Sequence, residues 1–182
     1  MQFYDIFMEA LQDISPVPVR FMEIDGEAKG YYHQTEKYIA IKTGMSNLQS
    51  MKTGVHEVAH AILHDNDVMD ADGIIKGKTA KEVEAESIAY IVCSHFGLDT
   101  SEYSFTYIAS WCESQNMKTL KASMDTIRKT SAGIIENIET KMHELEMERP
   151  IRETFHREDV ILHLSGSMGS ESVSYTHLTL PT

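Results

Sequence analysis

The sequence has few cysteines and no long hydrophobic run. No apolar stretch in its 182 residues approaches the ~20 residues that a membrane-spanning helix needs. Residues 1–5 are not a basic stretch leading into an apolar one, so no secretory signal is predicted. Cys93 and Cys112 do not have CxxC spacing, and we expect both to be small buried hydrophobic residues. These absences favour a cytoplasmic protein.

Positive charge is also scarce. The 28 acidic residues outnumber the 16 lysines and arginines, giving a net charge of −12. Because no basic stripe with interleaved aromatic residues occurs, we expect no direct binding of nucleic acid. The excess of negative charge is typical of a soluble protein surface. A second interpretation is that the acidic surface imitates nucleic acid toward a basic partner.

Length and composition predict one domain at residues 1–148, followed by an extension at 149–164 and a tail at 165–182. The tail holds five serines, three threonines, two glycines and one charged residue, which is typical of a disordered segment. Residues 174–182 look like translated sequencing-adapter sequence, so we expect the tail to be non-native and leave it out of the functional argument.

The strongest chemical signal is the motif His-Glu-x-x-His at residues 56–60. Residues four apart lie on one face of a helix, so His56 and His60 can reach a single metal ion. Glu57 can then reach a metal-bound water without being a ligand. Since a catalytic zinc ion takes three protein ligands and keeps one open position, the motif predicts a third ligand elsewhere.

The motif falls in a segment, 47–64, that is predicted to be an amphipathic helix. Ser46 or Asn47 is a plausible N-cap, and turn-forming residues follow at 65–67. His56 and His60 lie at the flank of the apolar stripe, where a helix borders both core and cleft. The stripe is formed by Leu48, Met51, Val55, Val58 or Ala59, and Ile62.

A second predicted helix, beginning at Thr79 and ending near Gly97, offers three glutamates as the third ligand. Glu82 and Glu86 share one flank of its apolar face, and Glu84 projects from the other. Because a packed helix presents one flank to the metal, we predict that Glu82 is the ligand. Glu86 would accept the free ring N–H of a ligating histidine. Glu84 is expected to be solvated. The apolar face consists of Ala85, Ile88, Ala89, Val92 and Phe96.

His64 adds a third histidine one turn beyond His60. Three such side chains spread along about 12 Å of helix axis and cannot all point at one metal ion. The chain also lacks the longer His-Glu-x-x-His-x-x-Gly-x-x-His pattern, because position 63 is Leu and position 66 is Asn. We therefore expect His64 to be structural or to contact a ligand from behind.

These motifs resemble the gluzincin branch of the zincin metallopeptidases. Residues 53–64 and 82–90 resemble two groups within it, the ImmA/IrrE-type metallopeptidases and the metallopeptidase domain of ArdC-like antirestriction proteins of plasmids and conjugative elements. Residues 96–111 also fit the ArdC-like domain, and the resemblance covers approximately residues 15–115. ArdC-like proteins usually carry a single-stranded-DNA-binding domain as well. Nothing here matches that domain, so DNA binding does not transfer.

The remaining pattern predicts an α+β fold, in which a small antiparallel sheet precedes a mainly helical metal-binding core. Residues 1–14 are predicted to form a helix that stops at Ser15-Pro16-Val17-Pro18. Helical structure resumes at Ser101, and a long helix over 118–148 is expected to be interrupted or kinked near 130–133. Short strands are predicted at 17–24, 30–33 and 37–42.

The sequence and the resemblance together predict a zinc-dependent peptidase acting on a protein or peptide. His56, His60 and Glu82 would hold Zn²⁺, and Glu57 would act as the general base toward water and return its proton to the leaving amine. The resemblance also implies an antirestriction or regulatory system of a mobile element.

Two questions stay open at this level. Tyr103, Tyr107 and His95 are all possible donors to the oxyanion, and the sequence does not choose among them. The alternative function is a zinc-binding, non-proteolytic interaction domain that acts through its acidic surface.

Overall fold

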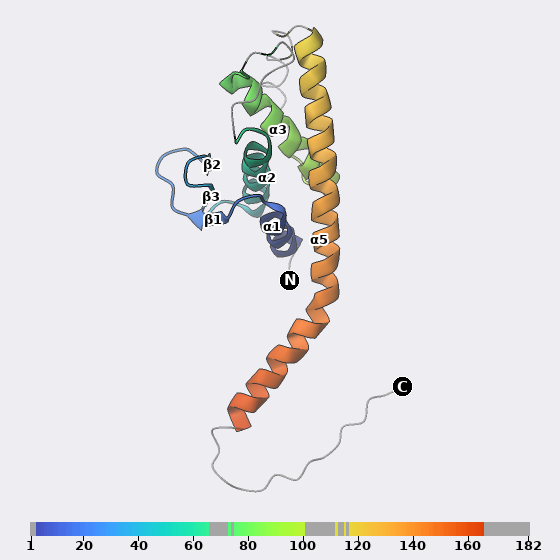
Figure 1. Cartoon of the computed structure of the whole chain (residues 1–182). Coiled ribbons are helices and arrows are strands. Elements are labelled where there is room, and N and C mark those ends of the chain that lie inside the picture. The colour runs from blue at the N-terminus through green and yellow to red at the C-terminus, as the bar shows by residue number, and fades with distance from the viewer. Residues whose placement is uncertain are drawn as a thin grey trace. The chain divides into compact units, whose positions relative to one another are not determined.

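The computed structural model describes residues 3–65, 73, 75–100, 112, 115 and 117–165, the side chains of 149–165 excepted. The chain divides into two compact units, residues 1–145 and 146–182. All contacts discussed below lie in the first unit, which includes the part of α5 up to residue 145. The elements, drawn in Figure 1, are α1 (Phe3–Ile14), β1 (Val19–Met22), β2 (Gly30–His33), β3 (Tyr38–Lys42), α2 (Asn47–Leu63), α3 (Lys78–His95) and α5 (Met117–Ser165).

The three strands form one mixed sheet in the order β1-β3-β2. β2 and β3 form an antiparallel pair with Tyr32 opposite Ile39, and β1 runs parallel to β3 with Val19 opposite Ile39. The predicted α+β class is confirmed, but the sheet is not antiparallel throughout. The reason is topological: β2 does not pair with β1 but takes the far edge, and β3 enters between them. An antiparallel turn back from β2 leaves β3 parallel to β1.

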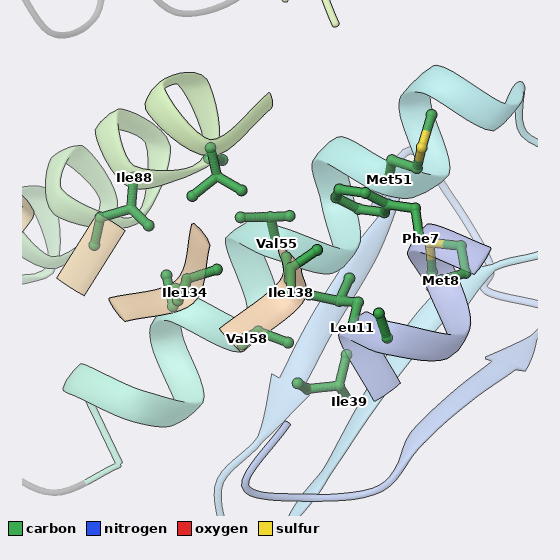
Figure 2. Close-up of a cluster of buried hydrophobic side chains, with 14 of the residues drawn as sticks. Phe7, Met8, Leu11, Ile39, Met51, Val55, Val58, Ile88, Ile134 and Ile138 are labelled. Carbon is green, nitrogen blue, oxygen red and sulfur yellow. The ribbon is translucent and has the colours of Figure 1, made fainter. Parts of the chain in front are cut away.

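The hydrophobic core lies where the sheet and four helices meet. Figure 2 shows side chains of α1, α2, β3, α3 and α5 converging on one cluster. The Phe7 ring on α1 meets the Phe96 ring edge-to-face, with ring centroids 5.3 Å apart. The fully or almost fully buried members include Phe7, Leu11, Ile39, Ile41, Val55, Val58, Ile88, Val92, Ile134 and Ile138.

The predicted helix α2 is confirmed, together with its N-cap. The Ser46 hydroxyl accepts a hydrogen bond from the Gln49 backbone N–H at 3.3 Å. Gly54 allows close approach of α1, since a Cβ there would lie 2.7 Å from Leu11 Cδ2. The apolar stripe is confirmed at its centre, where Met51, Val55, Val58 and Ala59 are buried. The prediction was wrong at the two ends of the stripe, because Leu48 and Ile62 are exposed.

Helix α3 and its end at Gly97 also agree with the prediction from the sequence. Gly97 has a φ of +74°, and the N–H of the next residue, Leu98, donates to the Cys93 carbonyl at 2.9 Å. Ala85, Ile88, Ala89 and Val92 have no exposed surface, as predicted. Cys93 is buried and free, and burial raises the pKa of its thiol to about 12. It is therefore an unreactive core residue.

The long helix α5 passes through residues 130–133 without a break, so the predicted interruption was wrong. Ser131, Ile134 and Ile138 are buried on one face there, and this packing outweighs the weak helix propensity of a single glycine at position 133. The helical face predicted from Tyr103 to Trp111 lies outside the described residues. Over the residues that are described, no helix combines the length and the apolar character that crossing a bilayer requires.

Candidate metal centre

Helices α2 and α3 bring the three predicted metal ligands together. The Nε2 atoms of His56 and His60 are 3.1 Å apart. The Glu82 carboxylate lies beside both rings, with one oxygen 3.5 Å from His56 Nε2 and the other 3.6 Å from His60 Nε2. One ligand atom from each residue can be chosen so that all three lie within 4.8 Å of one another. The four-residue spacing on α2 and the position of Glu82 on one flank of α3 thus bring the three side chains to one point.

The donor set fits a zinc ion. Bonds of about 2.0–2.1 Å in a tetrahedral site place neighbouring ligand atoms about 3.3–3.4 Å apart. The two histidine nitrogens, 3.1 Å apart, are close to that value, and one Glu82 oxygen lies within 4.8 Å of both ligand atoms of the histidines. Two ring nitrogens 3.1 Å apart repel each other if both present a lone pair, so this pair requires either an N–H on one ring or a cation bound by both. The Glu82 side chain is 37% exposed, which leaves one side of the group open to solvent.

The charges around the group also favour a cation. Burial lowers the pKa of His56, but hydrogen bonds to Glu82 and Glu86 and the charge of Glu57 outweigh burial and bring this pKa to about 9. Hydrogen bonds from His56 and His60 hold the pKa of Glu82 far below its ordinary value, against the opposing effect of burial. Three carboxylates therefore surround one histidine and stabilise positive charge there.

Glu86 lies behind His56, as predicted. One of its oxygens is 3.3 Å from His56 Nδ1, and the other accepts a hydrogen bond from Lys52 Nζ at 2.6 Å. When His56 Nε2 faces the metal, the remaining ring N–H lies on Nδ1. The Glu86 carboxylate can accept a hydrogen bond from it. The sequence analysis did not predict a role for Lys52. Its position one turn before His56, in a part of the helix whose other residues are buried, was the signal that could have indicated one.

Glu84 is the main correction to the predicted site. It was expected to be solvated, yet it has no exposed surface. Its Oε2 is 3.0 Å from His64 Nε2, and its Oε1 accepts a hydrogen bond from Lys76 Nζ at 2.5 Å. Burial would raise the pKa of Glu84, but hydrogen bonds from His64, Lys76 and Ser123 lower it overall. The second flank of α3 is thus buried as well, and its carboxylate is paired there.

His64 stands outside the group of candidate metal donors, and it is 2% exposed. Its Nδ1 is 3.0 Å from His60 Nδ1, so it contacts a predicted ligand on the side away from the metal. Burial lowers the pKa of His64, and the neighbouring Glu84 only partly offsets this effect.

Glu57, the predicted base, is held between α2 and β2. It is 8% exposed, and its carboxylate accepts a hydrogen bond from the Tyr32 backbone N–H. Burial raises the pKa of Glu57, while the His56 and His60 charges oppose that shift. Gly30 on β2 allows this close packing, because a Cβ there would lie 2.5 Å from Thr53 Cγ2 and 2.8 Å from the Ala40 carbonyl oxygen.

A cavity of about 1060 Å³ opens over the group. Residues of β2, α2 and α3 line it, and they include the three ligand candidates and Glu57. His95 does not line this cavity, and its Nε2 is 2.7 Å from Glu139 Oε1. The structure therefore does not bring this possible oxyanion donor to the site. The other two, Tyr103 and Tyr107, lie outside the described residues.

The sequence of this chain also matches a known protein family. Residues 12–111, more than half of the chain, match the M78 peptidase family, described as the IrrE N-terminal-like domain. The chain belongs to this family. The predicted resemblance to ImmA/IrrE-type peptidases is thereby confirmed.

One relative of this M78 domain is an uncharacterized protein of Bacillus anthracis. The two are 35% identical over 112 residues, which make up 61% of this chain and 18% of the relative. The chain thus spans less than a fifth of that protein's length. No solved structure matches the chain.

The contact between β2 and the motif helix gives a testable prediction for this M78 domain. Gly30→Ala should lower the free energy of unfolding by about 1–3 kcal/mol, because the added Cβ meets Thr53 and the β3 backbone. Gly133→Ala is the matched control. A Cβ there meets nothing within 4 Å, and alanine should stabilise α5 by up to about 1 kcal/mol. Thermal unfolding that ranks the two variants the other way would contradict this role for Gly30.

Proposed function

We propose that this protein is a zinc-dependent peptidase whose ligands are His56, His60 and Glu82. The observation that carries the proposal is the convergence of these three donors, within 4.8 Å of one another, beside a buried glutamate in a chain of a peptidase family. Zinc bound there would supply Lewis acidity toward a peptide carbonyl and lower the pKa of a bound water.

Glu57 is the proposed general base and acid. The Tyr32 backbone N–H fixes the orientation of its carboxylate, and burial raises its pKa toward the range in which a carboxylate accepts and returns a proton readily. It would take a proton from the attacking water and deliver it to the amine that leaves.

We propose a protein or an extended peptide as the substrate, with neither nucleic acid nor membrane as a partner. β2 lies at the edge of the described sheet and forms one wall of the cavity. An extended peptide could pair with that edge and so lie across the metal centre. The cavity lining reaches from Glu27 and Lys29, just before β2, to Lys81 and Glu86 on α3.

For the biological setting, we propose a cytoplasmic antirestriction or regulatory system of a mobile element. The support is the resemblance of residues 53–64, 82–90 and 96–111 to the ArdC-like and ImmA/IrrE-type groups. Conjugation genes beside the native gene would favour the ArdC-like setting. A repressor gene as the neighbour would favour a regulatory peptidase.

Chelation and metal add-back test the enzymatic proposal. Purified protein incubated with a mixture of unstructured peptides should cut some of them, and mass spectrometry identifies the products. A zinc chelator should stop cleavage, and zinc added in slight excess over the chelator should restore it. Cleavage that survives complete removal of metal would overturn the proposal. Tight zinc binding without cleavage of any peptide or candidate protein would instead favour the non-proteolytic interaction domain.

A further inference from the structure

A buried chain of polar side chains runs away from the metal centre behind His60. His60 Nδ1 is 3.0 Å from His64 Nδ1, and His64 Nε2 is 3.0 Å from Glu84 Oε2. Lys76 Nζ donates to the other Glu84 oxygen at 2.5 Å. The side chains of His64, Glu84 and Lys76 are 3%, 0% and 8% exposed. Water therefore cannot replace these partners.

The chemistry of these groups indicates one direction for each hydrogen bond in the chain. An ionised carboxylate only accepts, so Glu84 requires a proton on His64 Nε2. Because the Lys76 ammonium already balances the Glu84 charge, His64 can stay neutral, and its Nδ1 is then an acceptor. His60 must therefore donate from Nδ1. In a neutral imidazole, that leaves the lone pair on Nε2, the atom that faces His56 and Glu82.

We propose that His64, oriented by Glu84 and Lys76, is a positioning residue that fixes His60 in the tautomer able to bind metal through Nε2. The inference rests on the proposed metal centre. Without His64, a solvated or apolar neighbour would let the proton of His60 move to Nε2, which would block the metal. The His60 ring would also lose the contact that fixes its orientation.

The two proposed histidine ligands are thus supported in different ways. His56 has a carboxylate directly behind it, because Glu86 contacts its Nδ1 and is paired with Lys52. His60 has a neutral imidazole between its ring and the Glu84–Lys76 pair. Each support ends in a glutamate–lysine pair, and the second reaches outside α2 and α3 through Lys76 in the segment before α3 and Ser123 on α5. The His60 ring is therefore tied to parts of the fold beyond the two helices that carry the proposed ligands.

The tautomer itself can be measured in the wild-type protein. Long-range ¹H–¹⁵N correlation spectra of the zinc-free full chain distinguish a proton on Nδ1 from one on Nε2 of each histidine. We expect His60 protonated on Nδ1 and His64 protonated on Nε2. A His60 ring protonated mainly on Nε2 would overturn the inference, whatever the variants do.

Two substitutions of His64 then separate hydrogen bonding from packing. His64→Phe keeps the ring and removes the acceptor, and we expect about 10–100-fold weaker zinc binding in competition with a chromogenic chelator. His64→Asn places an amide oxygen near the position of Nδ1 and should recover most of the affinity. His95→Phe is the control, because His95 pairs with Glu139 and does not line the cavity. The zinc affinity of this variant should equal that of wild type.

The outcomes distinguish this inference from the proposed function. If wild type binds zinc and folded His64→Phe binds it equally well, the positioning role is wrong and the metal centre stands. If wild type binds no zinc, the proposed function fails, and the tautomer spectrum still tests the hydrogen-bond direction. Thermal unfolding of each zinc-free variant shows whether it is folded.

Discussion

Glu57→Gln is expected to reduce hydrolysis by roughly 10²–10⁴-fold while the protein still binds zinc. The amide keeps the size of the side chain and can still accept the Tyr32 N–H, but it cannot take a proton from water. Glu57 is also absent from the group of candidate ligands, so the metal should remain. The measurements are kcat/KM on a peptide substrate and the zinc content of the same preparation.

Glu136→Gln is the matched control for this prediction. It makes the same chemical change at an exposed position of α5, and its activity should equal that of wild type. A Glu57→Gln protein with activity within a few-fold of wild type would show that another group is the base. Loss of zinc from this variant would instead mean that Glu57 is a ligand.

Glu82→Ala is expected to weaken zinc binding by more than the roughly 10–100-fold that changes behind a ligand cost. The Glu82 carboxylate faces the Nε2 atoms of both His56 and His60, and no other described carboxylate completes this group. Glu84→Ala should weaken binding less, because Glu84 reaches the site only through His64. Competition with a chelator of known affinity gives the two values.

The same two variants should rank the opposite way in stability. Glu84→Ala leaves the buried Lys76 without its carboxylate and should cost about 3–5 kcal/mol of unfolding free energy in zinc-free protein. Glu82→Ala truncates a side chain that is 37% exposed and should cost much less. If Glu84→Ala instead lost more zinc affinity than Glu82→Ala, the third ligand would have to be Glu84.

The sequence predicted the parts of the site that depend on local helix geometry. His56 and His60 follow from a four-residue spacing on one helix, and Glu82 and Glu86 follow from the same spacing on another. Side chains at such spacings share a helix face whatever surrounds them. The N-cap at Ser46 and the end at Gly97 are likewise local, and the structure confirms both.

The parts that failed depend on what packs against a helix or strand. Glu84 was expected to be solvated because nothing in the sequence shows that Lys76 and Ser123 close over the second flank of α3. The break expected near residue 133 does not occur, because Ile134 and Ile138 are buried in the core. The parallel pairing of β1 with β3 similarly depends on which strand takes the far edge of the sheet.

The zinc content of wild-type protein purified without chelator tests the account most directly. Elemental analysis should find about one zinc ion per chain, and the ion should be lost when His56, His60 and Glu82 are replaced together. Protein that carries no zinc and takes up none when it is supplied, or a triple variant that keeps a full equivalent, would contradict the metal centre described here.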